Sequence, residues 1–330
     1  MKRLTSMLIV IMLCVPLLSP VVFASDSPSS WAIEQVNEAI SANIVPTTLQ
    51  SRYNQPITRA EFCALAVALY ENVKGEITER RTFADTNDVN VQKMAALGVV
   101  GGTDATRNLF SPDTNLTREQ AAVILARLAE TLDNPLPKLD SRATDRGSFS
   151  SWAIEAIGQV QAVGIMGGTG NNMFSPSQPY TREQSILTIL RLYKYEITSF
   201  DWWLWDITIF AIRAVDRIEA SSILSFNAGE GNKFLVMTLS AKLNHTRANP
   251  FLERIGLIRI IYDGIYQYDS VQLVGYSDDM HFRAMNPLAT RTGVVVFRVP
   301  DTVADKPLVM RFGGPLGERY TYDHHFNIQS

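Results

Sequence analysis

Three segments of the chain place apolar side chains on one helix face, and each begins with Thr followed three residues later by Glu or Gln. The tetrapeptides are Thr-Arg-Ala-Glu at 58–61 and Thr-Arg-Glu-Gln at 117–120 and 181–184. This arrangement is a capping box, in which the two side chains bond each other's backbone amides. Apolar residues stand eight and eleven positions after each Thr: Ala66, Leu69, Leu125, Leu128, Ile189 and Leu192. We therefore predict that a helix begins at each copy.

Each predicted capped helix closes a longer repeat, since the copies start 59 and 64 residues apart. In the third repeat an amphipathic helix begins at 152, a Gly-rich turn covers 164–168, and Phe-Ser-Pro stands at 174–176. The second repeat has the same order, with its turn at 98–102 and Phe-Ser-Pro at 110–112. Each unit is predicted to be a helix, a turn, a loop and a capped helix.

The three repeats are unequal. The first has Trp31, but Asn43 replaces the start of the Gly-rich turn and Phe-Ser-Pro is missing. Asn tolerates the left-handed conformation that ends a helix, so the turn is expected to survive. The second repeat has Thr86 where the third has Trp152. The third repeat is the most complete, and we expect the best-formed site there.

The capping box leaves one residue of each tetrapeptide unexplained. Arg59, Arg118 and Arg182 occupy the first helical position, where the helix dipole disfavours a cation by about 0.3–1 kcal/mol. One explanation is a buried ion pair with a neighbouring repeat. The other is an anion site, because a helix N-terminus and an Arg together favour a carboxylate or phosphate.

The start of the chain has the features of a secretory signal peptide. Lys2 and Arg3 precede an apolar run from Met7 to Leu18, and cleavage is expected after Ala24. The remaining chain has a single cysteine, Cys63, for which we predict a buried position and no disulfide. No later apolar run is long enough for a membrane helix. The formal charge of −3 argues against nucleic acid as a partner.

The pattern changes after residue 195 to short β-branched and aromatic runs separated by turn residues. Such spacing suggests an all-β antiparallel sandwich. The predicted strands are 207–215, 233–243, 255–262, 271–274, 293–299 and 308–312. The resulting division is a signal peptide at 1–24, repeats at 26–75, 80–135 and 141–195, a Trp-rich junction at 196–206 and the β-sandwich at 207–330.

The repeats resemble the S-layer homology (SLH) family. The resemblance rests on Phe-Ala-Asp at 83–85, Trp152, the turn at 164–168, Phe-Ser-Pro at 174–176 and the three tetrapeptides. It implies an all-α triplet with pseudo-threefold symmetry around a central helix bundle. It also implies grooves that bind secondary cell-wall polysaccharide through pyruvylated sugars.

A pyruvate ketal carries a carboxylate, which fits the unexplained arginines, so the resemblance implies that Arg59, Arg118 and Arg182 contact the polysaccharide. We expect Arg182 to contribute most and Arg59 least. The turn glycines Gly101, Gly102, Gly167 and Gly168 either let sugar approach the backbone or simply end helices. Trp31 and Trp152 either offer flat faces to sugar rings or belong to the core.

The second half has a weaker resemblance, to secreted telokin-like domains with an immunoglobulin (Ig) fold. It rests on the runs 231–244 and 286–300, with Leu288 replacing the usual Gly. The three Trp at 202, 203 and 205 either form a carbohydrate platform or, as we favour, pack the junction. Adjacent His324 and His325 point to opposite faces of a strand, which disfavours a metal site.

These observations favour a secreted, non-catalytic protein of the bacterial cell surface. The SLH repeats are expected to hold it non-covalently to pyruvylated wall polysaccharide while the Ig-like sandwich meets an unknown protein or sugar partner. No catalytic residues, metal or cofactor are predicted. The alternative is a wall-anchored enzyme acting on polysaccharide, which requires paired carboxylates in a cleft of the C-terminal domain. Asp201, Asp206 and Asp216 are near one another in sequence but do not form a convincing pair.

Overall fold

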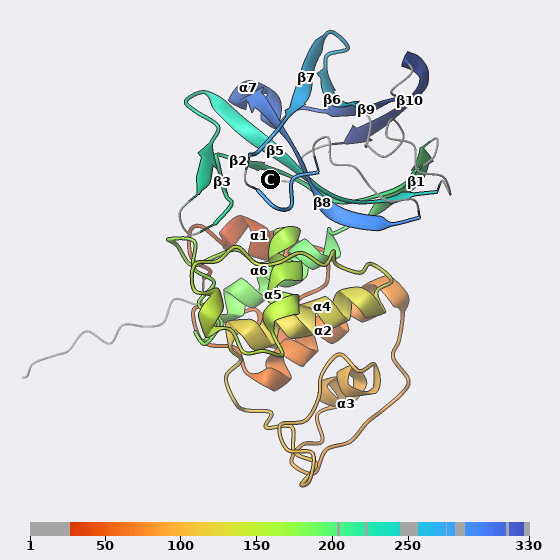
Figure 1. Ribbon diagram of the computed structural model, residues 1–330. Helices are drawn as coiled ribbons and strands as arrows, with labels where there is room; N and C mark the ends of the chain where they lie inside the picture. The colour runs from red at the N-terminus through yellow and green to blue at the C-terminus, as the bar shows by residue number, and fades with distance from the viewer. Residues whose placement is uncertain are drawn as a thin grey trace, which may run out of the picture.

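The structure is a computed structural model that describes residues 27–202, 205–221, 224–244, 257–274, 276–280, 288–314 and 317–326. The predicted signal peptide lies outside these residues. A helical half is followed by an antiparallel sheet that lies over one side of it, with α3 at the end farthest from the sheet (Figure 1). The expected change from all-α to all-β is confirmed.

The helical half contains each predicted capped helix. Its helices are α1 (Ile33–Ser41), α2 (Arg59–Lys74), α3 (Val89–Ala96), α4 (Arg118–Thr131), α5 (Ile154–Ala162) and α6 (Arg182–Tyr193), with 3-10 turns η1 (Thr47–Leu49) and η2 (Arg146–Ser148). The helices α2, α4 and α6 begin at complete capping boxes on Thr58, Thr117 and Thr181. Their apolar faces meet in one core that runs through all three repeats.

A ring of backbone hydrogen bonds joins the three repeats at the residue before each cap. The Ile57 amide donates to the Tyr180 carbonyl (2.8 Å), the Tyr180 amide to Leu116 (2.9 Å), and the Leu116 amide back to Ile57 (2.9 Å). All three side chains are buried. The repeats therefore contact one another in a cycle, and each has the other two as neighbours.

The C-terminal half is one sheet in the order β1-β2-β5-β8-β7-β6-β9-β10, with every pairing antiparallel. Its strands are β1 (Thr198–Trp202), β2 (Trp205–Val215), β5 (Asn232–Leu243), β8 (Thr290–Pro300), β7 (Tyr266–Val271), β6 (Leu257–Tyr262), β9 (Leu308–Gly314) and β10 (Gly317–Phe326). The hairpin β3 (Arg217–Glu219) and β4 (Ser225–Asn227) and the short α7 (Asp301–Ala304) complete the half.

The sheet folds over on itself where β7 meets β8, because these strands pair only at Ser270 and Val271. One core lies between the two layers and takes alternate residues of β5 together with residues of β6, β8 and β9. The other residues of β5, including Phe234 and Val236, join a second cluster on the opposite face. One face of the central strand therefore lies inside the sandwich, and its other face is covered on the side of the helical half, where Leu139 packs against the second cluster.

Two sequence predictions about this half are wrong. The Trp-rich junction is part of the sheet: β1 and β2 form a hairpin in which Trp202 pairs with Trp205. The Trp205 side chain is 1% exposed and belongs to the inner core of the sheet. The predicted strand at 271–274 is instead the end of β7 and a loop, in which Val274 is 74% exposed.

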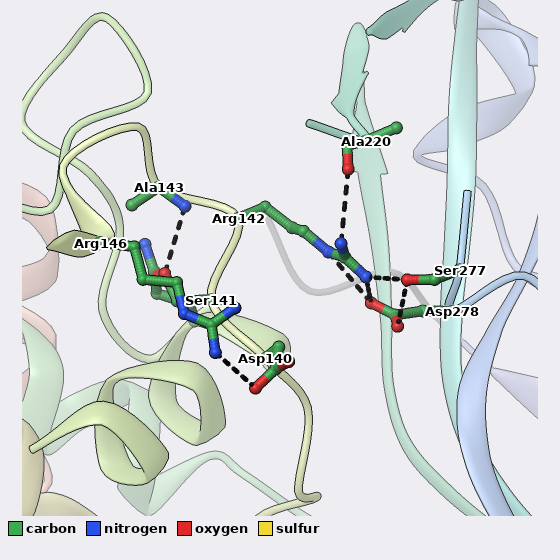
Figure 2. A network of polar contacts seen from close by, with 9 residues as sticks. Asp140, Ser141, Arg142, Ala143, Arg146, Ala220, Ser277 and Asp278 are labelled. Atoms are coloured by element: carbon green, nitrogen blue, oxygen red, sulfur yellow. Dashed lines mark hydrogen bonds and ion pairs between the residues drawn. The ribbon is translucent and has the colours of Figure 1, made fainter. Parts of the chain in front are cut away.

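The contact between the two halves comes from other residues. Arg142, in the loop before α5, reaches across to the Asp278 carboxylate (2.6 Å), the Ser277 hydroxyl and the Ala220 carbonyl, as Figure 2 shows. The Thr238 hydroxyl on β5 donates to the carbonyl of Ala162 at the end of α5 (3.2 Å). The third repeat therefore supports the sheet.

Candidate functional site

The arginines of the first two tetrapeptides cross into the following repeat. Arg59 Nε donates to the Phe110 carbonyl (3.0 Å) and Nη2 to the Gly101 carbonyl (3.0 Å). Arg118 repeats this with Phe174 (2.8 Å) and Gly167 (2.6 Å). Each guanidinium also lies over the Phe ring, at 4.5 Å from its centroid for Arg59 and 4.8 Å for Arg118. The Arg of one repeat thus holds the Gly-rich turn and Phe-Ser-Pro loop of the next.

The third arginine completes the cycle on different partners. Arg182 donates through Nη1 to the Ser51 carbonyl (2.6 Å) and through Nη2 to the Glu61 carboxylate (2.6 Å), and it is 2% exposed. Its partners both belong to the first repeat. The buried ion pair with a neighbouring repeat, one of the two explanations offered by the sequence, therefore holds for Arg182.

The other explanation, an anion held by a helix N-terminus and an Arg together, loses its backbone donors, so only the arginine side chain is left for it. In α2, the Thr58 and Glu61 amides bond the partner side chain of the capping box. The two amides between them, of Arg59 and Ala60, donate to the carbonyls of Thr114 and Pro112 in the next repeat (3.0 Å each). The N-terminal amides of α4 and α6 have the same kinds of hydrogen-bond partner. These three helix ends therefore have no amide left for a ligand.

The side chains of Arg59 and Arg118 keep hydrogen-bond donors that the protein itself does not use. No hydrogen bond uses Nη1 of Arg59 or Arg118 within the described part of the chain, and neither atom is among the buried polar atoms without a partner. Burial lowers the pKa of both guanidinium groups from a very high value, and both stay charged. Each guanidinium therefore keeps an N–H group that no described protein acceptor uses, beside a Gly-rich turn.

Carboxylates hold the Phe-Ser-Pro loops. Asp85 accepts from the Phe110 amide (2.8 Å) and the Ser111 amide (2.7 Å), and Asp145 does the same for the third repeat. The Phe110 amide above all, with help from the Ser111 amide and against partial desolvation, lowers the pKa of the Asp85 carboxyl. The loop conformation includes a left-handed Ser111, φ 60°, which these bonds stabilise.

A second set of carboxylates fixes the tryptophans, and sequence reasoning missed it. Glu119 accepts from the Ser150 amide (3.1 Å) and hydroxyl (3.0 Å), two residues before Trp152. Glu183 makes the same bonds to Ser29, two residues before Trp31 (2.9 and 3.0 Å). The tetrapeptide of the first repeat has Ala60 at this position, and the repeat that follows it has no Trp. The difference between Thr-Arg-Ala-Glu and Thr-Arg-Glu-Gln was the available signal.

The tryptophans so placed are not core residues. Trp31 is 57% exposed and Trp152 is 56% exposed. A large aromatic surface that is half in water is available to a ligand. The open alternative of a core position is therefore excluded for both.

The turn glycines separate into two kinds. A Cβ on Gly102 would stand 2.7 Å from the Leu109 carbonyl oxygen, and one on Gly168 would stand 2.7 Å from that of Met173. These two glycines are required by a close backbone approach. A Cβ added to Gly101 or Gly167 would meet nothing within 4 Å, and neither residue has a positive φ. The fold therefore does not require glycine at 101 or 167.

The helices before these turns end at other glycines. Gly98 and Gly164 are left-handed, with φ of 73° and 76°, and this is the conformation that commonly follows the last turn of a helix. Helix termination, the simpler explanation for the turn glycines, thus applies to Gly98 and Gly164 and leaves Gly101 and Gly167 for another role.

Other candidate residues are used structurally. Cys63 is fully buried, and burial raises the pKa of its thiol to about 12. His324 and His325 are consecutive on β10, opposite Met310 and Val309 of β9, and no group of three or more possible metal ligands occurs in the described residues. Asp206 and Asp216 pair with Lys242 and Lys233, whereas the Asp201 side chain and Trp203 lie outside what the structure describes.

The comparisons with known proteins agree with this repeat architecture. The profile of the S-layer homology domain family matches residues 90–122 and 144–184, in the second and third repeats. An endoglucanase of Bacillus sp. (strain KSM-635) is 26% identical over 222 residues, which are 61% of this chain and 23% of that protein. The cellulosome-anchoring protein of Acetivibrio thermocellus is 36% identical over 76 residues, 23% of this chain and 17% of that protein.

The chain matches less than a quarter of the length of either relative. Among solved structures, an uncharacterized β-sandwich protein from Clostridium difficile 630 is 18% identical over 39% of this chain and 90% of its own, with a TM-score of 0.31. The SLH match and the anchoring relative indicate a secreted protein associated with the cell wall. In the described residues, no helix combines the length and apolar character that crossing a membrane requires.

Proposed function

We propose that this chain is a non-catalytic cell-surface protein whose three repeats form an SLH triplet that binds pyruvylated secondary cell-wall polysaccharide. In this proposal the Ig-like β-sandwich is displayed for a protein or sugar partner. The cyclic bonds among Ile57, Leu116 and Tyr180 support a pseudo-threefold arrangement of the triplet. Attachment is non-covalent, through grooves at the Gly-rich turns.

The observation that carries the proposal is that one glycine in each Gly-rich turn, Gly101 or Gly167, has free space where a side chain would stand. The fold does not require glycine at 167 or 101, on steric or conformational grounds. The carbonyl of each nevertheless accepts a hydrogen bond from the Arg of the preceding repeat. A ligand that lies against the backbone explains the missing side chain. The adjacent guanidinium Nη1 supplies the cation that a ketal carboxylate requires.

The arrangement changes the expected ranking of the three grooves. Arg118 bonds the turn of the third repeat, so we assign Trp152, Gly167 and Arg118 to the groove of that repeat. The turn of the second repeat is served by Arg59 but has no Trp. Arg182 faces the first repeat and is taken up by Glu61 and Ser51. We therefore place the principal ligand contact at Arg118, with Arg59 second, and assign Arg182 a mainly structural part.

The test is co-sedimentation of purified protein with walls that retain the polymer and with walls stripped of it. We expect Gly167→Val to fold normally, since a Cβ at this position meets nothing within 4 Å, and to weaken wall binding about tenfold through loss of about 1.4 kcal/mol. Trp152→Ala should weaken binding similarly. The matched control is Gly147→Val, another glycine with nothing within 4 Å. Equal binding to stripped walls would refute the anchoring role, and unchanged binding by Gly167→Val would refute this groove.

The absence of catalysis is part of the proposal. In support, described carboxylates of the β domain that flank its sheet are paired with cations, as in Asp269 with Arg259 and Asp323 with Arg311. The match to the endoglucanase covers 23% of that protein, so it does not by itself support the same activity here. Release of reducing sugar from wall polysaccharide by the purified chain would favour the alternative of a wall-anchored enzyme.

A further inference from the structure

A cavity of about 240 Å³ lies between the two halves. Its floor is the end of α5 with the loop at 139–143, and its roof is formed by β2, β5 and the loop at 276–278. The Arg142 contacts to Asp278 and Ala220 bridge the same gap (Figure 2). Pockets for drug-sized ligands measure roughly 300–1,000 Å³, so this cavity suits a smaller molecule.

Arg213, near the end of β2, lines this cavity and lies against Gly164, just after α5. Its Cδ is 3.0 Å from the position of a Cβ on Gly164, so the glycine permits the approach. No hydrogen bond or ion pair of Arg213 is found within the described part of the chain, and its Nε is a buried atom without a partner. Burial lowers the pKa of its guanidinium. The side chain as a whole is half-buried, and its charge cannot be lost by deprotonation, so an anion that enters the cavity would meet a permanent cation.

The other charged side chains around the cavity are already neutralised. Each acid of the described lining has a basic partner, so the positive charge of Arg213 is left uncompensated there. The pairs are Arg142 with Asp278 (2.6 Å), Arg217 with Glu219 (2.5 Å) and Arg146 with Asp140 (3.1 Å). The protein supplies a cation in a confined space, and these residues supply no anion to meet it.

Neutral polar groups of the lining complete a possible site. The Gln161 Oε1 accepts from the Ser141 hydroxyl (2.5 Å), which leaves the Gln161 amide nitrogen as a donor into the cavity. The Thr238 hydroxyl donates to Ala162 and keeps its lone pairs as acceptors. Val236 and Val294 supply apolar walls. The lining therefore suits an oxyanion carried on a small polar body.

We propose that this cavity binds one small oxyanion, a carboxylate or phosphate on a molecule no larger than a monosaccharide, against Arg213. The ligand supplies the charge that the fold omits and ties β2 to α5. Binding therefore fixes the sheet on the third repeat. The site is separate from the wall-binding grooves, since none of Trp152, Gly167 and Arg118 lines it, and it stands whether or not those grooves bind polysaccharide.

The test measures the melting temperature of the secreted chain at constant ionic strength while the anion varies from about 0.1 to about 50 mM. The probes are sodium glucuronate and inorganic phosphate, with glucose as the neutral control. We expect either anion to raise the Tm by about 3 °C for each tenfold increase above its Kd. The arms distinguish a sugar acid from free phosphate. No response to either anion, or an equal response to glucose, would overturn the proposal.

Variants assign the response to the cavity. Arg213→Gln should lose the anion response, whereas Arg217→Gln, at the paired and exposed rim, should keep it. If Arg213→Gln shows no cooperative thermal unfolding, the Gln161→Glu variant tests the site instead. This near-isosteric change places a carboxylate in the same cavity, and we expect a higher Tm without anion and no further response. Retention of the full response by Gln161→Glu and by any folded Arg213→Gln would refute the site.

Discussion

Replacing Glu119 by Ala tests the link between one capped helix and the tryptophan of the next repeat. The Glu119 carboxylate is only 9% exposed and accepts two hydrogen bonds from Ser150, at 3.1 and 3.0 Å. Hydrogen bonds to charged groups contribute about 1.5–3 kcal/mol each. The negative charge in the first turn of α4 adds about 0.3–1 kcal/mol. Ala gains slightly in helix propensity, so we expect a net loss of about 3–6 kcal/mol in the free energy of unfolding.

Urea unfolding followed by circular dichroism measures this loss, with an unchanged dependence on denaturant as the sign of an intact fold. Ser150→Ala removes the hydroxyl donor alone, and a double-mutant cycle should give a coupling of about 1 kcal/mol between the two side chains. Glu130→Ala, on the exposed side of the same helix, is the control and should change stability by less than about 0.5 kcal/mol.

The reasoning is refuted by two results. One is a Glu119→Ala protein within about 0.5 kcal/mol of the parent. The other is additive behaviour of Glu119→Ala and Ser150→Ala, which would mean that the bond from the Ser150 hydroxyl contributes nothing. Glu183, which makes the same pair of bonds to Ser29, offers an independent repetition of the experiment.

Three further expectations concern stability and reactivity. Asp85→Asn should lower the Tm at pH 6, and because the folded-state pKa of Asp85 is depressed, its difference from the parent should shrink as the pH falls below about 4; a constant difference down to low pH contradicts this. Cys63 should react with a thiol reagent only in denaturant, since burial raises its pKa to about 12; fast labelling of the native protein contradicts its burial. Gly158→Ala should destabilise by about 1–3 kcal/mol, because its Cβ would stand 2.0 Å from the Leu139 carbonyl oxygen; Gly147→Ala is the matched control, and equal stability of the two variants is the contrary result.

The local part of the helical half could be predicted from sequence because its causes are local. The capping boxes at Thr58, Thr117 and Thr181 need only residues three apart, and each formed as expected. The partners of Arg118 lie 49 and 56 residues away, at Gly167 and Phe174. No spacing rule relates residues at such distances, so the sequence alone does not show that Arg59 and Arg118 each bond the turn of the following repeat.

In the sheet, too, some strands could be predicted from the sequence and others could not. The strand at 233–243 is predictable because residues 234–237 form a continuous apolar run and residues 238–243 alternate polar with apolar. The strand β7 carries Tyr-Gln-Tyr-Asp-Ser-Val at 266–271 and is largely exposed, so it gives no hydrophobic signal. The Trp-rich run is predicted to be a junction because only its composition is visible in the sequence. The hairpin pairing of Trp202 with Trp205 is visible only in the structure.

The cycle of backbone bonds through Ile57, Leu116 and Tyr180 fixes the number of repeats. In an open solenoid each repeat touches only its sequence neighbours, so copies can be gained or lost at the ends and the array can unfold from them. Here the Tyr180 carbonyl of the last repeat accepts from Ile57 of the first, and the ring has no free end. Loss of one copy would leave unpaired carbonyls and amides on the other two, and a fourth copy would find no place. The helical half is therefore expected to melt in a single step.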